Sequence, residues 1–130
     1  MRRKVLVVDD EPELLDFFVQ GLTGRGFDVV TATTGKGALE LTESEHPDVI
    51  TLDLNLPDMS GTEVFKALKN NELTKDIPVI MITGNTSGNE MVKHFDMGIE
   101  NYLTKPITSK EIATYIEGIL VSRAEEETGE

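Results

Sequence analysis

Residues 4–12 read Lys-Val-Leu-Val-Val-Asp-Asp-Glu-Pro. The apolar run that ends at Val8 has the length and β-branched composition of a short strand, and Asp9 and Asp10 end it. Pro12 suits the first turn of a helix, where a missing N–H has no consequence. The stretch therefore predicts a strand that passes through an acidic loop into a helix.

Four more runs of this kind follow, so that the predicted strands occupy residues 4–8, 28–33, 49–52, 79–83 and 101–103. Four helical patterns lie between them and a fifth follows the last strand. The first helix begins near Pro12 and ends at Gly24, with Phe17 off its apolar face, and the last opens at Thr108 or Ser109. Strict alternation of strands and helices predicts an α/β fold of parallel strands joined by right-handed crossovers.

Composition limits the chain to a single small domain. Its 130 residues are 38% hydrophobic and include no cysteine, which excludes disulfides and thiolate metal sites and fits a reducing, cytoplasmic location. The net charge of -12 argues against direct nucleic-acid contact, and no apolar run is long enough to enter a membrane. We expect a domain at residues 1–124 and a frayed acidic tail at 125–130.

Polar residues with useful chemistry follow four of the five predicted strands. In a flavodoxin-like doubly wound (βα)5 sandwich with the strand order 2-1-3-4-5, ligands bind beyond the carboxyl ends of the strands, and strands one and three are neighbours. The residues that would meet at this edge are Asp9, Asp10, Asp53, Thr83, Gly84 and Lys105.

Three aspartates in one crevice need a positive partner. At ~5 Å and an effective dielectric constant of ~20, each pair repels by roughly 3 kcal/mol. Oxygen ligands without histidine or cysteine favour a hard ion such as Mg²⁺, with Mn²⁺ as the alternative, and Lys105 adds a fixed charge. Asp53 is then the natural nucleophile toward phosphorus, and Thr83 and Lys105 would contact the phosphoryl oxygens. Gly84 would lie beside the phosphate and leave the acceptor open.

Four motifs together carry a family resemblance. They are Val-Leu-Val-Val-Asp-Asp-Glu-Pro at 5–12, Asp53 followed by Leu-Asn-Leu-Pro-Asp-Met-Ser-Gly, Ile-Thr-Gly at 82–84, and Tyr-Leu-Thr-Lys-Pro at 102–106. In their joint order and spacing the chain resembles the receiver domains of response regulators in two-component phosphorelays. The resemblance implies Asp53 as phosphoacceptor, Asp9 and Asp10 as the acidic magnesium pair, and a metal contact from the backbone carbonyl of Asn55.

The same resemblance implies a signalling domain rather than an enzyme, apart from its own phosphorylation and dephosphorylation. Thr83 and Tyr102 would switch the face built by the fourth helix, fifth strand and fifth helix, and the peptide bond before Pro106 would be cis. A histidine kinase or a histidine phosphotransfer protein would donate the phosphate. Independently of the resemblance, the position of Phe17 off the apolar face of the first helix predicts an exposed contact for this donor. A protein effector or output domain would respond, and phosphorylation could be linked to dimer formation.

Other classes of protein fit the same residues less well. An EF-hand loop starting at Asp53 would need glycine and glutamate where Asp58 and Val64 stand. The acidic pair would repel a flavin phosphate. An aspartyl-phosphate hydrolase of the haloacid-dehalogenase type would need a second aspartate where Asn55 stands. This hydrolase, and a metal-binding receiver-like interaction module without phosphotransfer, are the alternatives that stay open.

Overall fold

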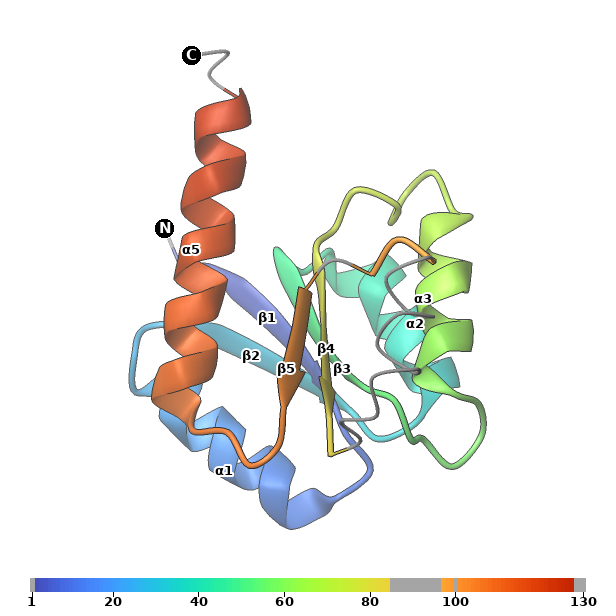
Figure 1. The fold of residues 1–130 in the computed structure, drawn as a ribbon, viewed down its shortest axis with the longest axis horizontal. Coiled ribbons are helices and arrows are strands. Elements are labelled where there is room, and N and C mark those ends of the chain that lie inside the picture. Colours follow the sequence, from blue (N-terminus) through green and yellow to red (C-terminus); the bar gives the residue numbers. More distant parts are fainter. Residues whose placement is uncertain (1, 85–96, 100, 128–130) are drawn as a thin grey trace.

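The computed structural model describes residues 2–84, 97–99 and 101–127. Within these ranges, helices cover both faces of one parallel sheet (Figure 1). The strands are β1 (Lys4–Val8), β2 (Asp28–Ala32), β3 (Val49–Asp53), β4 (Val79–Thr83) and β5 (Asn101–Thr104), and the helices are α1 (Pro12–Thr23), α2 (Gly35–Glu45), α3 (Gly61–Lys69) and α5 (Ser109–Glu127). The helix predicted between the last two strands falls mainly on residues 85–96, outside the described ranges.

The sheet has the order β2-β1-β3-β4-β5, which confirms the predicted flavodoxin-like topology. Val8 of β1 is paired with Leu52 of β3, so Asp9 and Asp53 are the next residues on two neighbouring strands. Asp53 in turn is paired with Ile82 of β4. The carboxyl ends of β1, β3 and β4 therefore meet at one edge of the sheet.

Alternate residues of β1 divide the apolar core into two layers. Val5 and Val7 pack with the apolar faces of α1 and α5, and Leu6 and Val8 pack with those of α2 and α3. Figure 1 shows the same division, with α1 and α5 on one side of the sheet and α2 and α3 on the other. Full burial of an aliphatic side chain contributes about 1.5–3 kcal/mol, so both layers stabilise the sheet that carries the strand ends.

Side chains cap the helices that follow the functional loops. Thr34 accepts a hydrogen bond from the backbone N–H of Gly37 at the start of α2, and Ser60 accepts one from Glu63 at the start of α3. At α5 the cap is Thr108, which accepts from the N–H of Glu111, while the Glu111 carboxylate accepts from the N–H of Thr108. This reciprocal capping box fixes where α5 begins after the β5 loop.

Several predicted boundaries were wrong by a few residues. β2 ends at Ala32 rather than Thr33, and β3 and β5 each include one more residue, Asp53 and Thr104. α5 continues through Glu127, although the acidic tail was predicted to begin at Glu125. Alanine and glutamate are good helix formers, and no glycine follows before residue 129, so nothing in the local sequence ends the helix earlier. No helix in the described part of the chain is long and apolar enough to cross a bilayer.

Candidate functional site

The candidate site lies at the carboxyl edge of the sheet and draws on three separate strands. Asp9 follows β1, Asp53 is the last residue of β3, and Lys105 follows β5. The strands hold these residues in place through backbone bonds: the N–H of Asp9 donates to the carbonyl of Ala32 at 3.1 Å, and the N–H of Lys105 donates to that of Thr83 at 2.8 Å. The predicted convergence of residues distant in sequence is confirmed.

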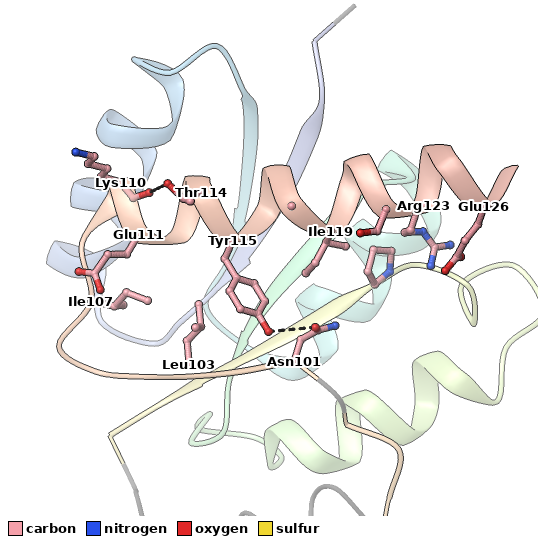
Figure 2. A pocket seen from close by; sticks show the side chains of 13 residues that line it. Asn101, Leu103, Ile107, Lys110, Glu111, Thr114, Tyr115, Ile119, Arg123 and Glu126 are labelled. Carbon is pink, nitrogen blue, oxygen red and sulfur yellow. Dashed lines mark hydrogen bonds between the residues drawn. The ribbon is translucent and has the colours of Figure 1, made fainter. Parts of the chain in front are cut away.

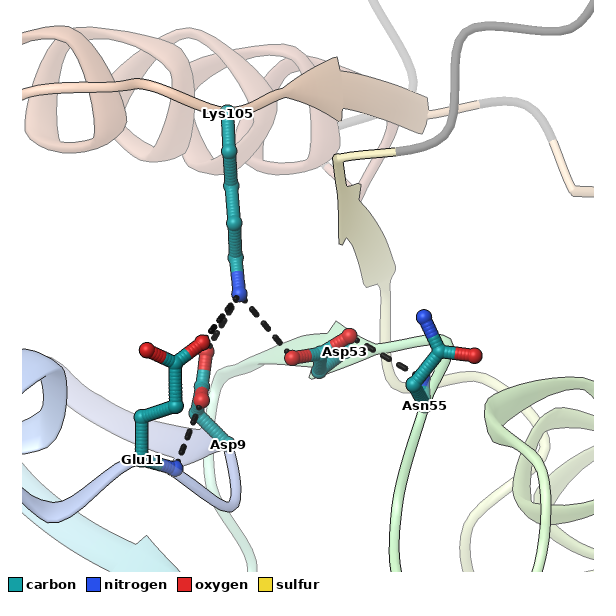
Figure 3. Close-up of polar contacts among 5 residues, drawn as sticks. All are labelled: Asp9, Glu11, Asp53, Asn55 and Lys105. Carbon is teal, nitrogen blue, oxygen red and sulfur yellow. Dashed lines mark hydrogen bonds and ion pairs between the residues drawn. The ribbon is translucent and has the colours of Figure 1, made fainter.

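Lys105 bridges the two buried carboxylates. Its Nζ lies 3.0 Å from Oδ2 of Asp9 and 3.0 Å from Oδ2 of Asp53 (Figure 3). The carboxylate side chains are only 4% and 6% exposed and the lysine side chain 20%, so water screens these ion pairs weakly. Glu11 lies at 3.7 Å from the same Nζ but is mostly exposed.

The second oxygen of each buried carboxylate is held by a backbone amide. Oδ1 of Asp9 accepts from the N–H of Glu11, and Oδ1 of Asp53 accepts from the N–H of Asn55, both at 3.0 Å. One oxygen of each side chain is thus turned to the backbone and the other to Lys105. Charge-assisted hydrogen bonds of this kind fix the orientation of both carboxyl groups.

Burial and ion pairing have opposite effects on the pKa values of Asp9 and Lys105. Burial raises the pKa of Asp9 above its ordinary value of 3.8, because desolvation outweighs the hydrogen bonds from Glu11 and Lys105. For Lys105 burial alone would lower the pKa, but the hydrogen bonds to Asp53 and Asp9 outweigh it, and the pKa lies above 10.5. The lysine is therefore held as an ammonium, whereas Asp9 carries its charge at a cost.

Asp10 completes a group of three carboxylates that could hold a metal ion. One oxygen from each of Asp9, Asp10 and Asp53 lies within 4.8 Å of the others, and Asp10 is exposed while the other two are buried. Three carboxylates and one lysine carry a formal charge of -2 when all are ionised. A cluster of oxygen donors with this charge fits a hard divalent cation such as Mg²⁺.

The loop after Asp53 returns tightly to the end of β3. The N–H of Gly61 donates to the carbonyl of Leu54 at 2.8 Å. A Cβ atom at position 61 would lie 2.4 Å from the carbonyl oxygen of Asp53, so only glycine allows this approach. Gly61 therefore begins α3 and also keeps this helix close to the end of β3.

The structure places the other predicted residues around this core. Thr83 ends β4 and is fully buried. Gly84 is exposed, and no atom of the described residues lies within 4 Å of where its Cβ would be. Tyr102 on β5 is half-buried and packs against the α2 and α3 side of the core. The Lys105–Pro106 peptide bond is cis, the form that the resemblance implies. Phe17 is 55% exposed on α1, as its position off the apolar face predicted.

Two residues of the site region were not expected from the sequence. Glu11 approaches Lys105, and Asp58 accepts hydrogen bonds from the first turn of α2. Glu11 directly follows the acidic pair, and this adjacency was the available signal. No such signal marked Asp58, because its hydrogen-bond partners lie more than twenty residues earlier in the chain.

A doubly wound domain with a lysine-bridged acidic cluster at its carboxyl edge is the arrangement that the resemblance to receiver domains implied. Residues 5–117 match the family described as the response regulator receiver domain, and the chain belongs to this family. It is therefore a receiver domain of two-component systems, and neither the hydrolase nor the non-transferring module gains support.

Several known proteins are similar to the chain. It is 37% identical over 120 residues to the alkaline phosphatase synthesis transcriptional regulatory protein PhoP of Bacillus subtilis, covering 92% of this chain and 49% of that protein. It is 45% identical over 107 residues to the transcriptional regulatory protein KdpE of Mycobacterium tuberculosis, covering 82% and 46%. The chain thus spans about half the length of these curated relatives.

A solved structure shares the fold closely. The response regulator receiver domain protein from Methanospirillum hungatei, described as CheY-like, superimposes with a TM-score of 0.88 at 29% identity and covers 97% of this chain and 99% of that one. The five-stranded topology with its helical layers is therefore that of the receiver family.

Proposed function

We propose that Asp53 is the residue that accepts the phosphoryl group, with Mg²⁺ held by Asp9, Asp10, Asp53 and the backbone carbonyl of Asn55. The supporting observation is the position of Lys105 Nζ, 3.0 Å from both Asp9 and Asp53. A carboxylate beside a fixed ammonium can attack phosphorus while the growing charge is neutralised. Mn²⁺, another hard cation, would fill the same role.

In the proposed step a carboxylate oxygen of Asp53 forms a bond to phosphorus. The bond from phosphorus to the donor, a phosphohistidine or a small acyl phosphate, breaks and its electron pair leaves with the donor. Lys105 contacts one phosphoryl oxygen, Thr83 donates a hydrogen bond to another, and Gly84 leaves room beside them. Bound Mg²⁺ supplies further positive charge to these oxygens. Hydrolysis of the acyl phosphate by water would reset the domain.

The phosphoacceptor is tested by mass spectrometry after incubation with acetyl phosphate and Mg²⁺. We expect one added phosphate on the wild-type protein, none without a divalent ion, and none on Asp53→Asn. The matched control Asp48→Asn removes an aspartate from the opposite edge of the sheet, before β3, and should label normally. Undiminished labelling of Asp53→Asn would move the acceptor to another residue.

We propose that partners recognise the face that includes β5 and α5. A groove of about 1100 Å³ runs along it, with apolar Leu103, Tyr115 and Ile119 in its lining and charged Lys110 and Arg123 toward its ends (Figure 2). The Tyr115 hydroxyl donates to Oδ1 of Asn101 at 3.2 Å, which ties α5 to β5. An effector, an output domain or a second copy of the domain would bind here.

The switch would act through Thr83 and Tyr102, which lie on the adjacent strands β4 and β5. Tyr102 packs on the α2 and α3 side of the sheet, so the switch would have to reach the α5 groove through β5. Phosphorylation would draw the Thr83 hydroxyl toward the phosphoryl oxygens and turn Tyr102 inward, which shifts a pre-existing equilibrium of the face. Amide spectra with and without a beryllofluoride phosphate mimic test this proposal. Unchanged signals from β5 and α5 would refute the coupling.

The phosphodonor would be a histidine kinase or a histidine phosphotransfer protein, with the exposed ring of Phe17 as one contact. Phe17→Ala should slow transfer from such a protein and leave labelling by acetyl phosphate unchanged. Equal slowing with both donors would instead indicate a folding defect. A cytoplasmic location, expected from the absence of cysteine, stays a prediction.

A further inference from the structure

The loop of residues 54–60, which we call the acceptor loop, joins Asp53 to α3 and carries Asn55. Its two ends are held together by the hydrogen bond from Gly61 N–H to the Leu54 carbonyl and by an antiparallel bridge between Asn55 and Ser60. At its start, the N–H of Asn55 donates to Oδ1 of Asp53 at 3.0 Å. The position of this loop therefore affects the orientation of the Asp53 carboxylate directly.

The far side of the acceptor loop is attached to α2. Oδ1 of Asp58 accepts from the N–H of Gly35 at 2.8 Å, and Oδ2 accepts from the N–H of Lys36 at 3.0 Å. The side chain of Met59 packs directly against Gly35. A Cβ atom on residue 35 would lie 2.3 Å from Cγ of Met59. The side chain of Thr34, the cap residue of α2, accepts from the N–H of Gly37, and the amides of the first two helical residues donate to Asp58.

From these contacts we infer that Asp58 is a positioning residue for the divalent-cation site, an inference that rests on the proposed function. Its two hydrogen bonds anchor the acceptor loop on α2, and the loop carries Asn55, which both orients Asp53 and would contribute a carbonyl to the cation. Residues that orient metal ligands commonly change the affinity by factors of about 10–100 when they are removed. Cation binding must strengthen the attachment to α2 to the same extent, because coupling between two sites is reciprocal.

Calorimetric titration with Mg²⁺ tests the inference. Asp58→Ala should bind Mg²⁺ on the order of tenfold more weakly than the wild type. Asp58→Asn retains one acceptor oxygen, so its Mg²⁺ affinity should lie between those of the wild type and Asp58→Ala. The matched control is Thr34→Ala, which removes the other cap of α2 without touching the acceptor loop. It should lower the melting temperature as Asp58→Ala does and leave Mg²⁺ affinity unchanged.

The loss of a negative charge could by itself weaken cation binding, and two further measurements separate this effect. Glu63→Gln removes an exposed charge from the first turn of α3 and should change the affinity far less than Asp58→Asn. At about 0.5 M KCl, long-range attraction is largely screened. The defect of Asp58→Ala should persist there, and a defect that vanishes with salt would overturn the positioning role.

Hydrogen exchange on the wild-type protein tests the reciprocal effect without any variant. Mg²⁺ should slow exchange of the amides of Gly35 and Lys36 more than that of Gly37, which Thr34 holds. Uniform slowing of all three, or none, would overturn the inference, as would equal affinity in the wild type and Asp58→Ala. Failure of the wild type to bind Mg²⁺ would overturn the proposed function itself, and this inference with it.

Discussion

Lys105→Met should destabilise the cation-free protein because it leaves two buried carboxylates side by side. Each pair between Nζ and a carboxylate oxygen, at 3.0 Å, contributes roughly 5 kcal/mol of attraction at an effective dielectric constant of ~20. Desolvation offsets much of this, and removal of one partner from a buried ion pair typically costs about 3–5 kcal/mol. We expect a loss near the lower end, about 3 kcal/mol, because the lysine side chain is 20% exposed.

Protonation limits this loss and makes it depend on pH. A carboxyl group with the ordinary pKa of 3.8 can be protonated at about pH 7 for roughly 4 kcal/mol, and at about pH 5 for only 1.6 kcal/mol. The variant can therefore relieve the repulsion by protonating Asp9, which burial already favours. The stability difference between wild type and Lys105→Met should shrink as the pH falls toward 4.

Urea unfolding followed by circular dichroism, in buffer with a chelator, measures this difference at several pH values. The double variant Asp9→Asn/Lys105→Met should recover much of the lost stability, because only one buried carboxylate remains. Mg²⁺ should also restore the single variant by replacing the missing positive charge. A Lys105→Met protein as stable as the wild type at neutral pH, or a loss that does not vary with pH, would refute the electrostatic account of the site.

Three further substitutions test the surroundings of the site by urea unfolding. Gly61→Ala should cost about 2–3 kcal/mol, since its Cβ would meet the Asp53 carbonyl. Gly118→Ala, whose Cβ would meet no atom of the described residues, should gain about 0.5–1 kcal/mol, and equal effects would contradict the close approach at Gly61. Ser109→Ala should raise stability by about 1 kcal/mol, because the buried Ser109 hydroxyl is without a hydrogen-bond partner within the described ranges; a clear loss would reveal one. The hydrogen bonds from the α2 amides of Lys36 and Gly35 lower the pKa of Asp58 below its ordinary value of 3.8. Ionised Asp58 therefore stabilises the fold above pH 3.8, and this stabilisation is lost as the pH falls through the pKa of Asp58 in the folded protein. Asp58→Asn should be less stable than wild type at neutral pH and converge with it in acid, and a constant difference would exclude the ionised contact.

The topology of the sheet could be predicted because strands and helices alternate without exception. That alternation leaves few arrangements, and in the 2-1-3-4-5 order the strands that lead to Asp9 and Asp53 are neighbours. Element ends were less predictable. Thr33 and Thr104 have the same β-branched character, yet only Thr104 belongs to its strand, since the ladder to the neighbouring strand decides the boundary rather than propensity.

The site could be predicted as a set of residues but not as a set of contacts. Residues at the carboxyl ends of parallel strands meet at one edge, which places Lys105 beside the aspartates. Which oxygen faces the lysine depends on the amides of Glu11 and Asn55, and no pattern in the sequence specifies this choice. The role of Asp58 could not be predicted for a related reason. Its hydrogen-bond donors are backbone amides, which every residue except proline has, so no sequence motif marks them.

The raised pKa of Asp9 shows how the site and the stability of the fold oppose each other. Burial makes the ionised form of Asp9 unfavourable even with Lys105 in contact, so the folded protein binds protons more readily than the unfolded chain between 3.8 and the folded pKa of this group. Stability from this residue therefore falls as the pH rises through that window. An apolar or amide side chain would avoid the cost, but it would bring no negative charge to a bound cation. Desolvation of Asp9 thus lowers the stability of this sheet edge. The same desolvation strengthens the charge interactions on which the proposed phosphoryl transfer depends.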